Sequence, residues 1–237
     1  MKKFYILLLL MVALAGFLFY RQIMRANQIT VQRVNAPLIS ANVTFIPDSN
    51  SEQTLGNPGA PITITEFMDL GCAKCLALHA TIKAFVSKNP LKIRLIWKDA
   101  VLPKIFSNQQ SLPAHRAAFC AGNPDFASPS HKASDEQSKA STGTENKFWE
   151  FVDLIAASKS NLAENNLKKI AENLQLDASK WWQCANSPEA EEAIKSSTQM
   201  ADQLGIKSLP AIFVNNKLIN TGKDINIEKM LEEFIRE

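Results

Sequence analysis

Alternating and helical patterns of apolar residues follow one another along the chain and predict an α/β protein. Residues 61–69 (PITITEFMD) alternate and are rich in β-branched side chains, which is typical of a strand. Apolar residues at three- and four-residue spacing then predict a helix over 72–87, ended by Asn89-Pro90. Residues 91–97 alternate again. The order strand, helix, strand indicates a βαβ unit with a right-handed crossover.

The middle of the chain is predicted to be helical, and its end returns to strands. Apolar residues recur at helical spacing over 112–121, 147–157, 162–174, 179–185 and 188–204. Residues 122–146 are rich in Ser, Lys, Asp, Glu and Thr, so we expect an exposed insertion there. Strands over 211–214 and 217–220 are joined by Asn215-Asn216, a pair that tolerates the positive φ of a hairpin turn. A closing amphipathic helix begins at Ile227.

The beginning of the chain is its most apolar stretch. Residues 4–20 (FYILLLLMVALAGFLFY) carry no charge and lie between Lys2-Lys3 and Arg21. This run reaches the roughly 17–25 residues that cross a bilayer and exceeds the roughly 7–15 apolar residues of a cleavable signal peptide. We therefore expect residues 1–21 to form an uncleaved signal anchor with one transmembrane helix. The alternative is cleavage after Ala13-Leu14-Ala15, and both interpretations place the rest of the chain outside the cytoplasm.

Residues 22–52 are polar and mixed, and they predict a linker with a short strand at 42–46. The whole chain has 26 Lys and Arg against 23 Asp and Glu, a net charge of +3. Several of these cations lie in the first thirty residues, which contain no acid, so the remaining body has no surplus of positive charge. A nucleic-acid-binding face needs such a surplus, and we expect no nucleic-acid partner.

The candidate chemistry lies in Cys72-Ala73-Lys74-Cys75. A CxxC motif at the start of a helix places the first sulfur over free N–H groups and the positive helix end, which stabilise a thiolate. Cys72 is then the nucleophile, and Cys75 can attack a mixed disulfide and release the partner. The alternative is half of a zinc site, but no second Cys or His pair follows at short spacing. We expect neither a metal nor a cofactor.

Motifs near both ends of residues 53–237 resemble those of one known family. The first combines 56–61 (GNPGAP) with 66–75 (EFMDLGCAKC), and the second is 205–215 (GIKSLPAIFVN). Together they resemble the exported thiol-disulfide oxidoreductases of the DsbA type, in the thioredoxin superfamily. The resemblance implies a thioredoxin fold for residues 53–237 with a helical insertion over about 108–204.

The resemblance also assigns roles to individual residues. Pro210 corresponds to a cis proline that faces the disulfide, where the backbone of Leu209 would pair with an extended substrate. Glu66 corresponds to a carboxylic acid beneath the active site, suited to accepting the proton of Cys75. The alternatives are a trans proline at the start of a strand and an exposed edge-strand glutamate. The expected catalytic residues are Cys72, Cys75, Glu66 and Pro210.

The expected function is thiol-disulfide exchange on exported proteins, most simply the oxidation of dithiols. The substrates would be extracytoplasmic proteins with thiols or disulfides, and a membrane redox partner would regenerate the site. Ala73 replaces the Pro common in the family and Lys74 replaces an aromatic residue or His, so the direction of exchange stays open. The alternative is a non-catalytic module that binds an extended peptide, with Cys72 and Cys75 permanently oxidised.

Cys120 and Cys184 fall on predicted helices of the insertion. In an exported protein they can form a structural disulfide, which the chain-entropy account values at roughly 4 kcal/mol. Two buried free thiols are the alternative. His79 and His115 are expected to be surface or core residues, without partners that would make them ligands.

Overall fold

A computed structural model describes residues 14, 16–17, 21, 39–42, 46–47, 52–102, 110–123, 146–222 and 226–236. The chain divides into two compact units, Met1–Ser40 and Ala41–Glu237, and the fold belongs to the second. Most of the predicted transmembrane helix and of the predicted linker lie outside the described residues, as does most of the exposed insertion expected over 122–146. Within the described ranges, no helix has both the length and the apolar character needed to cross a membrane.

A mixed sheet with the strand order β1-β6-β5-β3-β4-β2 forms the centre of the fold. Strands β3 and β4 are parallel, whereas β2 pairs antiparallel with β4, and β5 pairs antiparallel with both β3 and β6. Helix α2 supplies the crossover between the two parallel strands, as the βαβ pattern predicts. The strands are β1 (Ile39–Asn42), β2 (Gln53–Gly56), β3 (Ile62–Met68), β4 (Ile93–Asp99), β5 (Ala211–Val214) and β6 (Lys217–Ile219).

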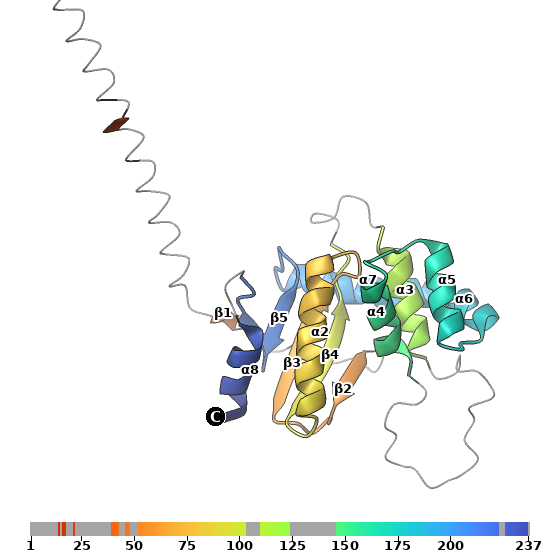
Figure 1. Cartoon of the computed structure of the whole chain (residues 1–237), viewed down its shortest axis with the longest axis horizontal. Helices are drawn as coiled ribbons and strands as arrows, with labels where there is room; N and C mark the ends of the chain where they lie inside the picture. The colour runs from red at the N-terminus through yellow and green to blue at the C-terminus, as the bar shows by residue number, and fades with distance from the viewer. Residues whose placement is uncertain are drawn as a thin grey trace, which may run out of the picture. The chain divides into compact units, whose positions relative to one another are not determined.

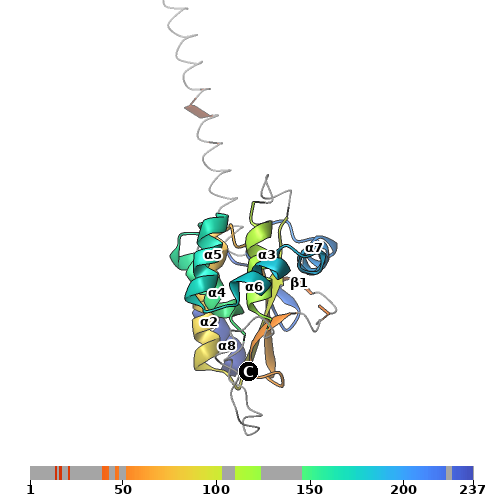
Figure 2. The same cartoon turned by 90° about the vertical axis from the view of Figure 1, so that its right-hand side faces the viewer.

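Helices cover both faces of the sheet and extend beyond one edge (Figure 1). Figure 2 shows α2 and α8 on one side of the sheet and α7 on the other. Helices α3, α4, α5 and α6 come from one continuous part of the sequence and pack mainly on each other. The helices are α2 (Ala73–Lys88), α3 (Leu112–Ala121), α4 (Phe148–Ala157), α5 (Glu164–Asn173), α6 (Ala178–Ala185), α7 (Pro188–Gln203) and α8 (Ile227–Arg236).

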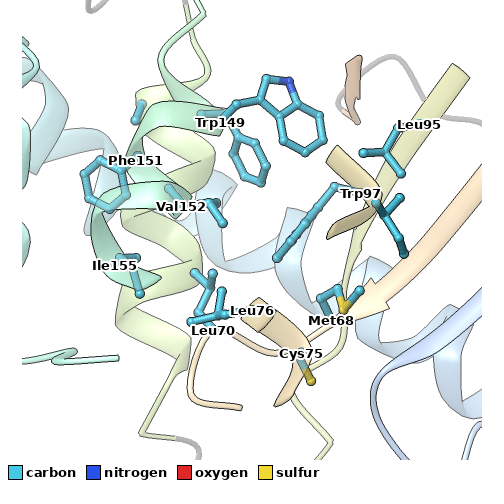
Figure 3. Packing of buried hydrophobic residues seen from close by; sticks show 14 of the residues in the cluster. Met68, Leu70, Cys75, Leu76, Leu95, Trp97, Trp149, Phe151, Val152 and Ile155 are labelled. Carbon is cyan, nitrogen blue, oxygen red and sulfur yellow. The ribbon is translucent and has the colours of Figure 1, made fainter. Parts of the chain in front are cut away.

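Strand β3 separates two hydrophobic clusters because its side chains alternate between the faces of the sheet. Ile62, Ile64 and Met68 belong to the larger cluster, which also contains the buried face of α2 and the core of α3–α6 (Figure 3). Phe67 belongs to the smaller cluster on the α7 face, where its ring meets Phe213 with the ring centroids 5.7 Å apart. The same alternation places residue 66 on the face of α2.

The first residues of the domain contain a strand that the hydrophobic pattern does not predict. Strand β2 is short and forms an edge, with Gln53 opposite Trp97 of β4. Just before it, Glu52 pairs with Lys98, whose side chain is 1% exposed and whose Nζ also donates a hydrogen bond of 2.7 Å to the Pro47 carbonyl. The position of β2 therefore depends on its pairing with β4 and on the burial of the Lys98 ammonium group. Its own apolar residues do not determine it.

Two predicted strand boundaries were wrong. The strand predicted over 91–97 begins at Ile93 and continues to Asp99, and Leu91 is 76% exposed. The reason is a turn after α2, in which the N–H groups of Lys92 and Ile93 both donate to the Asn89 carbonyl. The short strand predicted at 42–46 shares Asn42 with the observed strand β1 and does not include Ile46, and residues 43–45 are outside the described ranges.

Candidate active site

The CxxC motif lies where the chain leaves β3 and enters α2. Cys72 is the N-cap residue, with extended backbone angles, and its Sγ accepts a hydrogen bond of 3.1 Å from the Cys75 N–H. The Cys72 N–H donates to the Asp69 carbonyl at 3.0 Å, which closes the turn. Cys72 and Cys75 form a disulfide with their Cα atoms 5.2 Å apart. The first sulfur therefore lies at the positive end of the helix, where a thiolate is stabilised.

The two sulfur-bearing residues differ in their access to solvent. Cys72 is 8% exposed, whereas Cys75 is completely buried. Cys75 belongs to the larger hydrophobic cluster together with Met68, Leu70 and Leu76 (Figure 3). A partner sulfur approaching from solvent therefore meets Cys72 first, and Cys75 reacts within the protein.

A cis proline lies beside this motif. The Leu209–Pro210 peptide bond is cis, and it precedes β5 directly. Because Ala211 pairs with Phe67, Pro210 lies next to the end of β3 from which the cysteine loop departs. Two hydrogen bonds connect the parts: Lys74 Nζ donates to the Thr221 carbonyl at 3.2 Å, and Thr221 Oγ1 donates to the Pro210 carbonyl at 3.1 Å. The structure thus brings Pro210 and the CxxC motif together.

Behind Cys75 lies a buried pair formed by Glu66 and His79. Glu66 of β3 is completely buried and His79 of α2 is 2% exposed, and His79 Nδ1 lies 2.5 Å from Glu66 Oε1. His79 follows Cys75 by four residues on the same face of the helix. Glu66 Oε2 and His79 Nε2 contact no hydrogen-bond partner in the described part of the chain. The pair therefore combines a carboxyl group with a base at the buried side of the motif.

Two tryptophans fix the orientation of this pair. The His79 ring stacks on Trp149 of α4 with a centroid distance of 5.5 Å and meets the edge of Trp97 of β4 at 5.2 Å. Lys83 of α2 in turn donates a hydrogen bond of 3.4 Å from its Nζ to the Trp149 carbonyl. The helical insertion thus supplies one wall of the candidate site, in addition to packing within itself.

A second histidine cluster supports the loop before Cys72. His115 of α3 is completely buried, with Nδ1 2.5 Å from Asp99 Oδ1 and Nε2 3.7 Å from Asp69 Oδ1. Burial lowers the pKa of His115, but hydrogen bonds and charges from Asp69 and Asp99 outweigh it and raise the pKa to about 9. Burial likewise raises the pKa of Asp69, but His115, the Gly71 N–H and Ser111 together hold that pKa below its ordinary value.

His79 and His115 are core residues, but each has carboxylate partners that the sequence analysis did not predict. His79 contacts the buried Glu66, and His115 contacts Asp99, which is 13% exposed. One signal was present in the sequence, because Asp69 directly follows β3, Asp99 ends the parallel strand β4, and the carboxyl ends of such strands meet at one edge of a sheet. No local pattern indicates that His115, on a helix of the insertion, reaches that edge. Across the described ranges, no group of three or more His, Cys, Asp or Glu side chains is arranged to hold a metal ion.

The remaining cysteines are joined inside the insertion. Cys120 of α3 and Cys184 of α6 form a disulfide with Cα atoms 5.9 Å apart, across 64 residues of sequence. Next to it, Trp181 Nε1 donates a hydrogen bond of 2.9 Å to the Ala117 carbonyl, which also joins the two helices. The structure therefore has the bridged arrangement rather than two free thiols.

Comparison with known proteins agrees with this architecture. A family model described as "Thioredoxin" matches residues 48–234. The "Probable disulfide bond formation protein D" of Bacillus anthracis is 21% identical over 199 residues, which cover 79% of this chain and 80% of that protein. The Na(+)/H(+) antiporter NhaA 3 of Salinispora tropica is 22% identical over 170 residues, but the chain spans only 22% of its length.

Solved structures give the same result. The thiol-disulfide exchange protein alpha-DsbA2 of Wolbachia pipientis superposes with a TM-score of 0.61 at 19% identity, covering 79% of this chain and 87% of that one. Oxidised BdbD of Bacillus subtilis gives 0.62 at 17% identity, covering 84% of this chain and all of that one. These likenesses show a shared fold and confirm the expected similarity to DsbA-type proteins. With a family model matched over most of its length, the chain belongs to the thioredoxin family.

Proposed function

We propose that this protein is a thiol-disulfide oxidoreductase of exported proteins, and that it oxidises dithiols through Cys72 and Cys75. The observation that carries the proposal is the arrangement of the motif: the Cys72 sulfur caps helix α2, and the Lys74 side chain connects the motif through Thr221 to the cis Leu209–Pro210 bond. A purely structural disulfide needs neither feature. The relatives named for thiol-disulfide exchange and for disulfide bond formation support the same class of reaction.

The reaction is two successive exchanges of sulfur bonds. A substrate thiolate attacks Sγ of Cys72, the Cys72–Cys75 bond breaks, and Cys75 is released as a thiolate while a mixed disulfide forms. A second substrate thiolate then attacks the substrate sulfur of that mixed disulfide and releases Cys72 as a thiolate. The substrate leaves with one new disulfide, and the protein keeps the two electrons as its reduced dithiol.

The buried pair manages the proton of Cys75. A thiolate released at a completely buried position has lost its hydration, so it needs a proton from a nearby group. Glu66, held in place by His79, lies on the face of β3 that packs against α2 and is the residue assigned to this transfer. In the reverse direction the same carboxylate accepts the proton, which makes Cys75 a nucleophile for the release of a trapped partner.

The direction of exchange follows from the reduced state. The Cys75 N–H and the start of α2 stabilise a thiolate on Cys72, and this stabilisation exists only when the disulfide is open. Whatever stabilises the reduced form makes the disulfide a stronger oxidant. We therefore favour oxidation of substrates, with the backbone of Leu209 holding an extended substrate chain beside Cys72.

The proposed setting is the outer face of a cell membrane. Residues 1–21 would anchor the protein, residues 22–52 would link the anchor to the domain 53–237, and 108–204 would be its helical insertion. The Cys120–Cys184 disulfide supports an oxidising compartment. Substrates would then be extracytoplasmic proteins with thiols, and a membrane redox partner would accept the electrons.

The reduction potential tests the proposal. The full-length chain is equilibrated with glutathione buffers, and the oxidised fraction of Cys72–Cys75 is measured. An oxidant or isomerase gives about −120 to −200 mV, whereas a value below about −300 mV indicates a structural disulfide and supports the peptide-binding alternative. In a second arm, Cys75→Ser should accumulate mixed disulfides with substrate peptides. Cys72→Ser is the matched control and should accumulate none; equal trapping by both variants would contradict the assignment.

A further inference from the structure

The loop between β3 and α2 is held by side chains that play no part in the proposed exchange. Asp69, at the start of the loop, is 1% exposed, and its Oδ1 accepts the Gly71 N–H at 2.6 Å. Its Oδ2 accepts the Ser111 hydroxyl at 3.0 Å, and its carbonyl accepts the Cys72 N–H at 3.0 Å. The Leu70 N–H donates to Nε2 of His115 at 3.0 Å. The N–H groups of Leu70, Gly71 and Cys72 therefore all donate hydrogen bonds to Asp69 or His115.

The contact between Leu70 and His115 depends on the protonation of the imidazole. Nε2 accepts the Leu70 N–H only through its free lone pair, and therefore only in the neutral ring. In the imidazolium form Nε2 carries a proton and needs an acceptor, and Asp69 Oδ1 lies 3.7 Å away. Nδ1 keeps its contact with Asp99 in both forms, because it donates in each. The two forms therefore require different partners for the same nitrogen.

We propose that His115 is a positioning residue for the loop that carries Cys72. When its Nε2 is protonated, that nitrogen no longer accepts the Leu70 N–H and donates to the Asp69 carboxylate instead. This inference rests on the proposed function and adds a regulation of the same site. When Nε2 turns to Asp69, the Leu70 N–H loses its partner, and the loop leading to Cys72 relaxes. The rate of exchange then depends on the protonation of a residue in the helical insertion.

Both forms of His115 are within reach of ordinary conditions. The two carboxylates raise its pKa to about 9, so the imidazolium dominates at neutral pH and the neutral ring at higher pH. Asp69 comes from the loop after β3, and Asp99 comes from β4, where it also accepts the Trp97 Nε1–H at 2.8 Å. Helices α4 to α7 also pack on α3, but within the described ranges Asp69 and Asp99 are the charged groups that raise the pKa of His115, against the effect of burial. Arg116, next to it on α3, pairs instead with Glu191 of α7.

A titration of the oxidised full-length chain tests the exchange of partners directly. Amide and imidazole NMR shifts are followed as the pH rises through the midpoint of His115. The Leu70 and Gly71 amides should move with the same midpoint as the His115 ring. Amides that stay constant while His115 titrates would overturn the inference. This measurement needs no variant and no activity, so it decides even if substitutions at His115 prevent folding.

A matched pair of variants tests the effect on the reaction. In His115→Gln the carboxamide oxygen can accept the Leu70 N–H but does not titrate. We compare the exchange rate constant of this variant with that of the wild type as a ratio, because titration of the substrate thiol affects both and cancels. The ratio should change with pH and have its inflection at the His115 midpoint, because only the wild type titrates at this residue. Arg116→Gln removes the neighbouring charge, and its ratio should stay flat.

The outcomes of the two tests separate the inference from the function on which it rests. A flat ratio for His115→Gln, or an inflection of equal size for Arg116→Gln, would overturn the positioning role. If the wild type shows no exchange while its amides still titrate with His115, the proposed function fails and the change of hydrogen-bond partner stands.

Discussion

The two disulfides of the chain contact the same large hydrophobic cluster but differ in their place in the fold. Cys72 and Cys75 are three residues apart at the start of a helix, where Cys72 is 8% exposed and its sulfur accepts the Cys75 N–H. Cys120 and Cys184 are 64 residues apart and join two helices. A bridge across a long loop removes far more freedom from the unfolded chain than one across a single helical turn. Under the proposed function, the first disulfide carries the chemistry and the second stabilises the fold.

Helix α3 takes part in both regions. Its first half carries His115, which contacts the loop before Cys72, and its last turn carries Cys120. The second disulfide therefore fixes a helix on which the first depends. Variants that change only one of the two disulfide regions are therefore needed to measure their effects on activity and on stability separately.

The largest expected effect separates the two disulfides by activity. Cys72→Ser should abolish thiol-disulfide exchange, because it removes the sulfur that an incoming thiolate attacks. Cys120→Ser should leave exchange close to the wild-type rate at a temperature where the domain stays folded. The measurement is the rate of peptide dithiol oxidation, with circular dichroism to verify folding. Comparable losses in both variants would break the comparison.

Stability should show the opposite order. Replacing both Cys120 and Cys184 by Ala should lower the free energy of unfolding by about 4 kcal/mol, since the bridge closes a long loop. The double replacement of Cys72 and Cys75 by Ala is the control and should cost much less. Urea denaturation measures both, with the free energy extrapolated to zero urea for each variant, because loss of a cross-link also changes the denaturant slope. A larger loss at the CxxC motif would reverse the assignment.

The region of the first disulfide should also be the one whose stability depends on pH. His115 has its pKa raised from 6.5 to about 9 in the folded protein, so its contribution is complete below about 6.5 and is lost as the pH rises through about 9. The shift corresponds to about 3 kcal/mol at roughly 1.4 kcal/mol for each pKa unit. Unfolding free energies between pH 6 and 10 should fall in the wild type. The decrease in unfolding free energy with pH should be smaller in His115→Gln. It should be unchanged in the variant in which Cys120 and Cys184 are both replaced by Ala.

The buried pair gives a further kinetic distinction. Glu66→Gln keeps the size of the side chain but removes proton transfer, and it should slow steps that protonate or deprotonate Cys75 by about a hundredfold. Glu164→Gln, at an exposed residue of α5, is the control and should have no effect. Rapid-mixing kinetics of mixed-disulfide formation and release provide the measurement. An unchanged rate in Glu66→Gln would show that Cys75 obtains its proton elsewhere.

The smallest effect concerns the contact between the CxxC motif and the cis-proline loop. Thr221→Val removes the hydroxyl that donates to the Pro210 carbonyl, at a cost of about 1 kcal/mol. We expect a weakening of peptide binding by roughly fivefold, with little change in reduction potential. Thr221→Ser retains the hydroxyl and should restore binding. A change in potential without a change in binding would place the role of this contact in the redox step.

Local signals predicted the elements that they control. The boundaries of α3 and of β5 agree with the sequence, and Ser187 caps α7 as such residues do, accepting the Ala190 N–H at 3.2 Å. Asn215 and Asn216 adopt the positive φ expected of the hairpin turn. Each of these features is decided by residues within one turn of the chain.

The polar contacts of the candidate site were beyond such signals. The CxxC motif and the cis proline can be read from spacing and resemblance, but Asp69, Asp99 and His115 come from three separate elements. Only packing of α3 against the carboxyl ends of β3 and β4 brings them together. Strand β2 was missed for a related reason, because an edge strand needs only a partner backbone and not an apolar repeat of its own.

The buried cation of β4 sets a limit on how the domain can be shortened. Lys98 depends on Glu52 and on the Pro47 carbonyl, and the neighbouring Ile46 N–H donates to the side chain of Asn216. A protease that cuts just before Gln53 would leave an ammonium group with no counterion in the interior, although every strand of the βαβ unit would remain. Ile46, Pro47 and Glu52 therefore take part in the folded domain, although they precede its first predicted residue.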